Sequence, residues 1–206
     1  MKKHRYFLIA IAALVLGIVV ASQFTNRPAR PEISATYLPG GKPVTEFSLV
    51  DSRGRPFDHD ALEGRWSLLF FGYTYCPDVC PMTLNVMANA YRRIEEAGGE
   101  TPQVVLVSVD PQRDTPERLA EYTGYFHPDF IGATGERDQI DRLTKSLGVA
   151  YAIHEDPDGD GQYLVDHSGM VFAINPNGDF QALFSDTFDA EQIAHDYLAL
   201  RDTWTN

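Results

Sequence analysis

The chain alternates short apolar runs with segments whose apolar residues recur at helical spacing. Two runs, 66–73 and 103–109, are almost continuously apolar, which is typical of strands that are buried on both faces. Residues 46–51 instead alternate apolar and polar side chains, as a half-buried strand does. This pattern predicts a sheet whose central strands are covered on both sides.

A helix is expected after each of the two buried strands. Residues 81–97 place apolar side chains at helical spacing and are followed by a Gly-Gly pair, which commonly ends a helix. Thr115 and Pro116 favour the start of a second helix, because Thr caps backbone N–H groups and Pro fits the first turn. Two more helices are predicted over 136–147 and 190–200.

The remaining apolar runs predict shorter strands, two of which form a hairpin. The turn is Asn175-Pro-Asn-Gly178, a sequence that favours a tight connection. Strand–helix alternation followed by an antiparallel hairpin and a last helix predicts an α/β fold, with a mixed central sheet flanked by helices. The shorter strands are expected at 130–132, 149–153, 162–165, 170–174 and 180–184.

The N-terminus has the pattern of a membrane segment. Residues 1–5 are basic and 6–21 are apolar or small, so we expect a cytoplasmic flank at 1–5 and a transmembrane helix at 6–22. A cleaved signal peptide is the alternative, but its apolar core is usually only about 7–15 residues long. Residues 23–43 contain Pro and Gly and predict a flexible tether, which leaves 44–206 as the folded domain. The basic flank predicts a single-pass protein of the bacterial inner membrane, with its soluble domain facing the periplasm.

The charge of the chain limits its partners. Its net charge is −12, and five of its 17 basic residues lie in the first 30 positions, which contain no acid. The rest therefore has 12 basic and 29 acidic residues. Nucleic-acid binding relies on clustered Lys and Arg, so we expect no nucleic-acid partner.

The two cysteines are the clearest candidates for chemistry. Cys76 and Cys80 follow the first buried strand, at the point where a helix begins. Residues four apart are neighbours on a helix, and the free N–H groups of its first turn favour thiolates. A disulfide across so short a loop would stabilise the fold little, so we expect a redox pair or ligands for a soft ion such as Cu(I) or Zn(II). Their position makes the fold thioredoxin-like, although redox motifs of that type have Cys-x-x-Cys spacing.

Two thiolates rarely complete a metal site, and histidine is the obvious source of a third ligand. His167 stands out because it follows the apolar residues Tyr163-Leu-Val165 and precedes Ser-Gly, in an expected loop between two strands. An isolated loop histidine is more often an ordinary surface residue, so the residues alone leave its role open. The other histidines are His4, His59, His127, His154 and His195.

Three motifs together resemble those of the SCO/SenC family. They are Phe71-Gly-Tyr-Thr-Tyr-Cys-Pro-Asp-Val-Cys-Pro81, Val109-Asp-Pro-Gln-Arg-Asp-Thr-Pro116 and Tyr163-Leu-Val-Asp-His-Ser168. Members of this family are membrane-tethered copper-binding proteins that help to assemble cytochrome c oxidase. The resemblance runs from about residue 44 to the C-terminus, and it implies that the copper ligands are Cys76, Cys80 and His167.

The first two motifs also hold closely spaced charges. Asp110, Arg113 and Asp114 could form a docking surface or a loop fixed by an Arg–Asp pair, and the sequence favours the structural loop. Asp78, between the cysteines, is expected to stay exposed at the helix start, where it would cap backbone N–H groups or contact a partner.

The resemblance implies a copper metallochaperone that binds Cu(I) and Cu(II) and assists assembly of the copper centre in cytochrome c oxidase subunit II. The implied partners are subunit II, a periplasmic copper donor and thiol–disulfide reductants. A metallochaperone has no catalytic residues, but Cys76 and Cys80 would remain a redox-active pair. The alternative is therefore an enzyme, a thiol–disulfide oxidoreductase acting on subunit II or other envelope thiols. A peroxide-reducing thiol enzyme ranks last, because no Thr or Arg support for a peroxidatic cysteine is evident.

Overall fold

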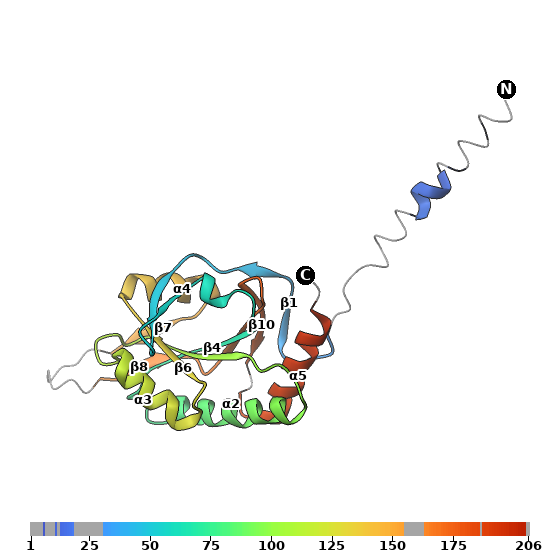
Figure 1. Ribbon diagram of the computed structural model, residues 1–206. Coiled ribbons are helices and arrows are strands. Elements are labelled where there is room, and N and C mark those ends of the chain that lie inside the picture. The colour runs from blue at the N-terminus through green and yellow to red at the C-terminus, as the bar shows by residue number, and fades with distance from the viewer. Residues whose placement is uncertain are drawn as a thin grey trace.

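The computed structural model describes residues 31–154, 163–185 and 187–204, together with residues 6, 11 and 13–18. Its centre is an eight-stranded mixed sheet, visible in Figure 1. The strands are β1 (Thr36–Pro43), β2 (Ser48–Asp51), β3 (Pro56–Asp58), β4 (Ser67–Gly72), β5 (Gln103–Ser108), β6 (Ile131–Thr134), β9 (Val171–Ile174) and β10 (Asp179–Phe184). Their order across the sheet is β1-β10-β9-β4-β5-β6-β2-β3, with β4, β5 and β6 parallel to one another.

Helices cover both faces of this sheet. The elements outside it are η1 (Asp60–Leu62), α2 (Val79–Glu96), α3 (Pro116–Phe126), α4 (Arg137–Leu147), β7 (Tyr151–Ile153), β8 (Val165–His167) and α5 (Ala190–Thr203). As Figure 1 shows, α2, α3 and α5 pack on one face and α4 on the other. β7 and β8 form a separate antiparallel pair. The predicted mixed sheet flanked by helices is confirmed.

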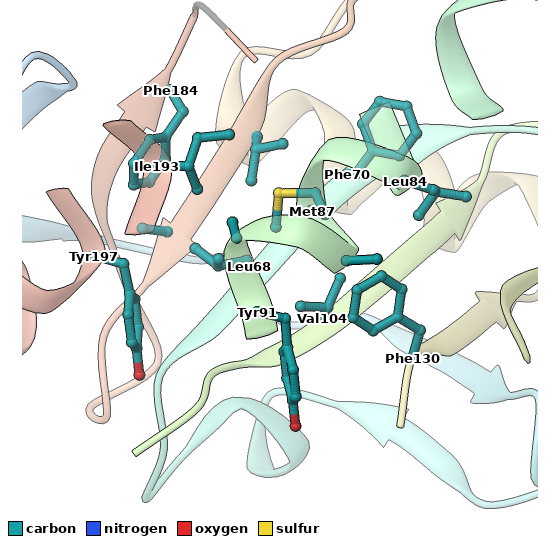
Figure 2. Close-up of a cluster of buried hydrophobic side chains, with 14 of the residues drawn as sticks. Leu68, Phe70, Leu84, Met87, Tyr91, Val104, Phe130, Phe184, Ile193 and Tyr197 are labelled. Atoms are coloured by element: carbon teal, nitrogen blue, oxygen red, sulfur yellow. The ribbon is translucent and has the colours of Figure 1, made fainter. Parts of the chain in front are cut away.

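Each face of the sheet has its own hydrophobic cluster, which explains the continuous apolar run of β4. Successive side chains of a strand point to opposite faces. Leu68 and Phe70 join the cluster with α2, α3 and α5, whereas Leu69 and Phe71 join the cluster with α4. Figure 2 shows Leu68 and Phe70 in the first cluster, together with Met87 of α2. A strand that serves two cores has no polar face.

Local signals identified several element ends correctly. The side chain of Thr115 accepts a hydrogen bond from the backbone N–H of Arg118, and Pro116 lies at the start of α3, as predicted. The turn from Asn175 to Gly178 joins β9 to β10, and Gly178 adopts a positive φ of 80° that favours glycine.

The folded domain begins earlier than the expected boundary at residue 44. Residues 36–43, predicted as part of the tether 23–43, form β1 and pair with β10 at the edge of the sheet. The strand is irregular, because Gly40 and Gly41 have φ values of 84° and 69° and interrupt the pairing. Proline is tolerated in an edge strand, because the backbone N–H groups on the open side of the strand have no partner strand to bond. The same residues that suggested a tether are therefore compatible with an edge strand.

Most of the expected anchor over 6–22 lies outside the described residues, as do residues 23–30. Within the anchor, residues 6, 11 and 13–18 are helical. Among the residues that the structure describes, no helix is both long and apolar enough to span a bilayer. The anchor stays a prediction.

A buried carboxylate fixes the segment that leads into β1. Asp196 of α5 is 1 % exposed. Its Oδ2 accepts hydrogen bonds from the backbone N–H groups of Ser34 and Ala35, both at 2.9 Å. Its Oδ1 accepts a hydrogen bond from Gln192 Nε2 at 2.7 Å. The Asp196 carboxylate thereby accepts hydrogen bonds from two backbone N–H groups that precede β1 and have no partner in the sheet.

We expect Asp196→Ala to lower the free energy of unfolding by about 2–3 kcal/mol, because two backbone N–H groups lose a charged acceptor. Urea-induced unfolding of the full chain in detergent, followed by circular dichroism, measures this change. Asp202→Ala is the matched control, since the Asp202 side chain lies on the same helix and is 64 % exposed. It should change the stability by less than about 0.5 kcal/mol. Equal effects of the two substitutions would contradict the prediction.

Candidate metal centre

Cys76, Cys80 and His167 lie together at the carboxyl end of β4. Cys76 is in the turn after β4, Cys80 is the second residue of α2, and His167 is the last residue of β8. Their sulfur and ring nitrogen atoms all lie within 4.8 Å of one another, and Cys80 Sγ is 3.3 Å from His167 Nε2. The predicted loop position of His167 is corrected to the end of a strand, where it lies opposite Tyr151.

Cys80 is packed so closely that its position depends on a glycine. The Cys80 side chain is fully buried, and a Cβ added at Gly72 would lie 2.5 Å from its sulfur. Such a distance is too short for any side chain, so β4 has to end in glycine for the sulfur to lie against the strand. The position of this sulfur is therefore determined by the backbone of the central sheet.

Cys76 is half-buried and lies where the first turn of α2 leaves backbone N–H groups without helical partners. Its sulfur accepts a hydrogen bond from the N–H of Cys80 at 3.5 Å. Asp78 is exposed at the N-cap position, as expected, but its side chain makes no capping bond, so this bond to the Cys76 sulfur takes that role.

The pKa of the Cys76 thiol is lowered, and Cys76 is therefore a thiolate at neutral pH. The largest cause is hydrogen bonding from the Cys80 side chain. Burial acts in the opposite direction, and the His167 side chain and the backbone N–H of Asp78 add to the lowering.

Cys80 and His167 complete the centre, and the protonation of the Cys80 thiol differs from that of Cys76. Burial raises the pKa of the Cys80 thiol, and the adjacent Cys76 side chain raises it further, so Cys80 keeps its proton. His167 Nδ1 lies 3.3 Å from the carbonyl oxygen of Ser168, which can only accept a hydrogen bond. Its Nε2 lies 3.3 Å from Cys80 Sγ. The metal-free centre thus contains a thiolate and a thiol beside the His167 ring.

Two aromatic side chains orient the His167 ring. Phe70 and Tyr73 contact it edge to face, at centroid distances of 6.0 and 5.7 Å. The Tyr73 hydroxyl also accepts a hydrogen bond from the backbone N–H of Val165 at 3.3 Å. The strand that carries His167 is thereby tied to the end of β4, which leads into Cys76.

Two fully buried carboxylates connect the remaining parts of the centre. Asp114 accepts hydrogen bonds from the N–H of Thr74 at 3.0 Å and from its hydroxyl at 2.6 Å. Asp110 accepts a hydrogen bond from the hydroxyl of Tyr163 at 2.6 Å and forms an ion pair with Arg113. The predicted Arg–Asp pair is confirmed, and this loop connects the cysteine turn with the segment before His167.

Sequence reasoning missed the roles of Gly72 and Tyr73, although both lie in the motif that contains the cysteines. A glycine at the end of a buried strand does indicate a close approach by another group. The sequence does not indicate which atom approaches it, because Cys80 reaches Gly72 only after α2 has packed on the sheet.

The donor set fits a soft metal ion. Metal–ligand distances of ~2.0–2.3 Å place three donors around one ion about 4 Å apart, so the observed separations need only small side-chain shifts. Thiolates together with imidazole suit copper and zinc rather than magnesium or calcium. Among the described residues, one other group could hold a cation, but two of its members are exposed: His59, Asp60 and Glu63.

The sequence has clear relatives. Residues 37–201 match the family model described as SCO1/SenC. A protein of Stutzerimonas stutzeri, named putative copper-binding protein, is 40 % identical over 170 residues, which are 82 % of this chain and 82 % of the relative.

Solved structures share the fold. ScoI of Arabidopsis thaliana with copper bound has a TM-score of 0.70 and 35 % identity, over 77 % of this chain and 98 % of that one. The apo Sco1 protein of Thermus thermophilus has a TM-score of 0.73 and 36 % identity, over 84 % of this chain and 99 % of that one. Together with the match to the family model, these relatives confirm what the three motifs implied: the chain belongs to the SCO1/SenC family.

Proposed function

We propose that the protein is a copper metallochaperone whose ligands are Cys76, Cys80 and His167. The observation that carries this proposal is the convergence of their donor atoms within 4.8 Å of one another. Two relatives support it, because one is named a copper-binding protein and the other was solved with copper bound. Two sulfurs and one imidazole suit Cu(I), and an added water or other ligand would accommodate Cu(II).

The centre suits transfer better than storage. Cys80 is fully buried, whereas Cys76 and His167 are only half-buried, so an incoming ligand can approach from their side. Binding of Cu(I) as a dithiolate complex releases the proton of Cys80, and that proton can return when copper leaves. The buried sulfur thus stays in place while the exposed side of the centre exchanges ligands.

The proposed physiological role is assembly of the copper centre in cytochrome c oxidase subunit II, with copper supplied by a periplasmic donor. The family resemblance supports this role. We also propose that residues 6–22 anchor the protein in the bacterial inner membrane, with the folded domain in the periplasm. The basic residues at 1–5 and the apolar run that follows support this orientation.

A second candidate function is thiol–disulfide exchange with subunit II or other envelope thiols. Both cysteines are free, and half-buried Cys76 is in the thiolate form that attacks disulfides. Cys80 is close enough to resolve a mixed disulfide. The two functions use the same sulfurs, but only copper binding requires His167.

Copper affinity tests the proposed ligands. We expect one Cu(I) per reduced full chain, and a loss of at least about 100-fold in affinity for Cys76→Ser, Cys80→Ser or His167→Ala. Even groups that only orient a ligand contribute ~10–100-fold, so a direct ligand should contribute more. Competition with a Cu(I) chelator under anaerobic conditions measures this. His154→Ala is the control, because His154 directly follows β7, the partner strand of β8, but pairs with Asp166. Full affinity in His167→Ala would show that the three-ligand centre is wrong.

The lowered pKa of Cys76 predicts a weak pH dependence of its alkylation. An ordinary thiol loses most of its thiolate between pH 8 and pH 6, so its alkylation slows by roughly two orders of magnitude. Cys76 should keep its thiolate and slow by less than about threefold. Peptide mapping after brief iodoacetamide treatment of the metal-free, reduced chain measures each cysteine separately.

Two controls accompany this alkylation measurement. Cys80→Ala removes the hydrogen bond that lowers the Cys76 pKa most, so this pKa should rise and the alkylation rate should depend more steeply on pH. Cys80 itself should react only after unfolding in urea, because it is buried and protonated. An ordinary pH dependence of Cys76 in the wild type would contradict the prediction.

Reaction with the soluble domain of oxidase subunit II separates the two candidate functions. If the protein delivers copper, the copper-loaded wild type should transfer the ion to subunit II. His167→Ala should abolish this transfer, because the variant cannot hold the ion. Exchange predicts reduction of an oxidised subunit II domain that survives His167→Ala and is lost in Cys76→Ser. Transfer of copper and formation of free thiols are measured in parallel, with His154→Ala as the control. Thiol reduction without copper transfer by the wild type would reject delivery.

A further inference from the structure

Among the described residues, Arg118 has no ionic partner, although it lies beside the metal centre. Its Nε donates a hydrogen bond to Thr74 Oγ1 at 2.7 Å, and its guanidinium carbon lies 4.3 Å from the centroid of the Tyr75 ring. No carboxylate oxygen of a described residue lies within 4.0 Å of its nitrogens. Since Tyr75 directly precedes Cys76, these contacts hold a guanidinium next to an accessible ligand.

Tyrosines extend this surface along α3, which lies beside α2 in Figure 1. Arg118, Tyr122 and Tyr125 are spaced to lie on one helix face, and together with Glu121 they line a cavity of about 280 Å³. Tyr125 is 84 % exposed and Tyr75 is 49 % exposed. Arginine and tyrosine are enriched at the energetic centres of protein interfaces. We call Tyr75, Arg118, Tyr122 and Tyr125 the arginine–tyrosine patch.

The neighbouring Arg113 has a different role. Its guanidinium carbon lies 3.6 Å from the centroid of the Tyr163 ring, but it pairs with fully buried Asp110 and its side chain is only 13 % exposed. Its charge is therefore compensated inside the protein. Arg118 is exposed and presents its charge outward, in a chain that has 12 basic and 29 acidic residues beyond position 30.

A protein that exchanges copper with this centre has to close over Cys76, and it then also covers Arg118. A guanidinium that loses its water without gaining an anion is strongly unfavourable. The two terminal nitrogens of arginine match the two oxygens of a carboxylate, while the tyrosine rings offer contact area at a low entropic cost. The favourable complex is one in which the partner supplies a carboxylate opposite Arg118.

We propose that the arginine–tyrosine patch is the docking site for the protein partner in copper transfer, and that this partner presents a carboxylate beside its own metal site to Arg118. The inference rests on the proposed function in copper transfer. A partner that is acidic all over would be repelled by the rest of the domain, so the carboxylate has to be a local feature. Arg118 then sets the orientation of docking and rejects proteins that leave it unpaired.

Copper transfer from the full chain in detergent to the copper-free soluble domain of oxidase subunit II tests this proposal. Arg118→Glu should slow the second-order transfer at least about tenfold, because the partner carboxylate then meets a like charge. Arg142→Glu is the matched control, since Arg142 is exposed on α4, on the opposite face of the sheet, and should transfer at the wild-type rate. Replacement of the contacting acid in the acceptor by Lys should restore transfer from Arg118→Glu.

The affinity for Cu(I) and the binding to vesicles complete the test. Arg118→Glu should bind Cu(I) as the wild type does, because Arg118 is not a ligand and Thr74 remains bonded to Asp114. Reduced copper affinity would assign Arg118 to the centre itself and overturn the docking site. If Arg118→Glu transfers copper at the wild-type rate, the docking proposal is also overturned, while delivery stays intact. If this variant loses only its binding to anionic phospholipid vesicles, Arg118 contacts lipid and not the protein partner. If the wild type binds copper but neither binds nor supplies subunit II, delivery fails first and the docking proposal fails with it.

Discussion

The contact between Cys80 Sγ and His167 Nε2, 3.3 Å long, joins residues that are 87 positions apart, and the whole centre depends on it. Cys80 belongs to the first turn of α2, whereas His167 ends a strand outside the main sheet. The backbone at Gly72 fixes the first residue, and the ring of Tyr73 orients the second. Because both donors are held close together before any ion arrives, binding needs only small side-chain shifts, and little ordering entropy is lost when copper binds.

Polar groups that would be unfavourable in isolation maintain this arrangement. A buried carboxylate is costly unless hydrogen bonds satisfy it, and Asp110 and Asp114 are both fully buried. Burial raises the pKa of Asp114, while hydrogen bonds from Thr74 and Ser108 act in the opposite direction. Each bond connects a different segment around the metal centre. We interpret the network as specifying how these segments meet, since a hydrogen-bonded pair has stricter geometry than an apolar contact.

How far the fold and the centre could be predicted depended on the range of the interactions involved. β4 was predictable because a strand that is buried on both faces has an almost continuous run of apolar residues. β1 was missed because its glycines and prolines indicate a tether, and only its pairing with β10 makes it a strand. Cys76 and Cys80 were predictable from their spacing, but His167 needed the family motif, because its place after a short apolar run suits an ordinary surface histidine equally well. Gly72 was overlooked for the same reason, since its neighbour is brought there by packing.

The different protonation of the two sulfurs links copper binding to thiol chemistry. Cys76 is the accessible thiolate, so an incoming copper ion and an incoming disulfide both meet it first. Cys80 keeps its proton until an ion or an oxidant removes it. Copper occupies the nucleophile that exchange would need, and a disulfide removes both sulfurs as ligands. The centre can therefore support only one of the two proposed reactions at a time, and the redox state of its own thiols decides whether it can hold copper.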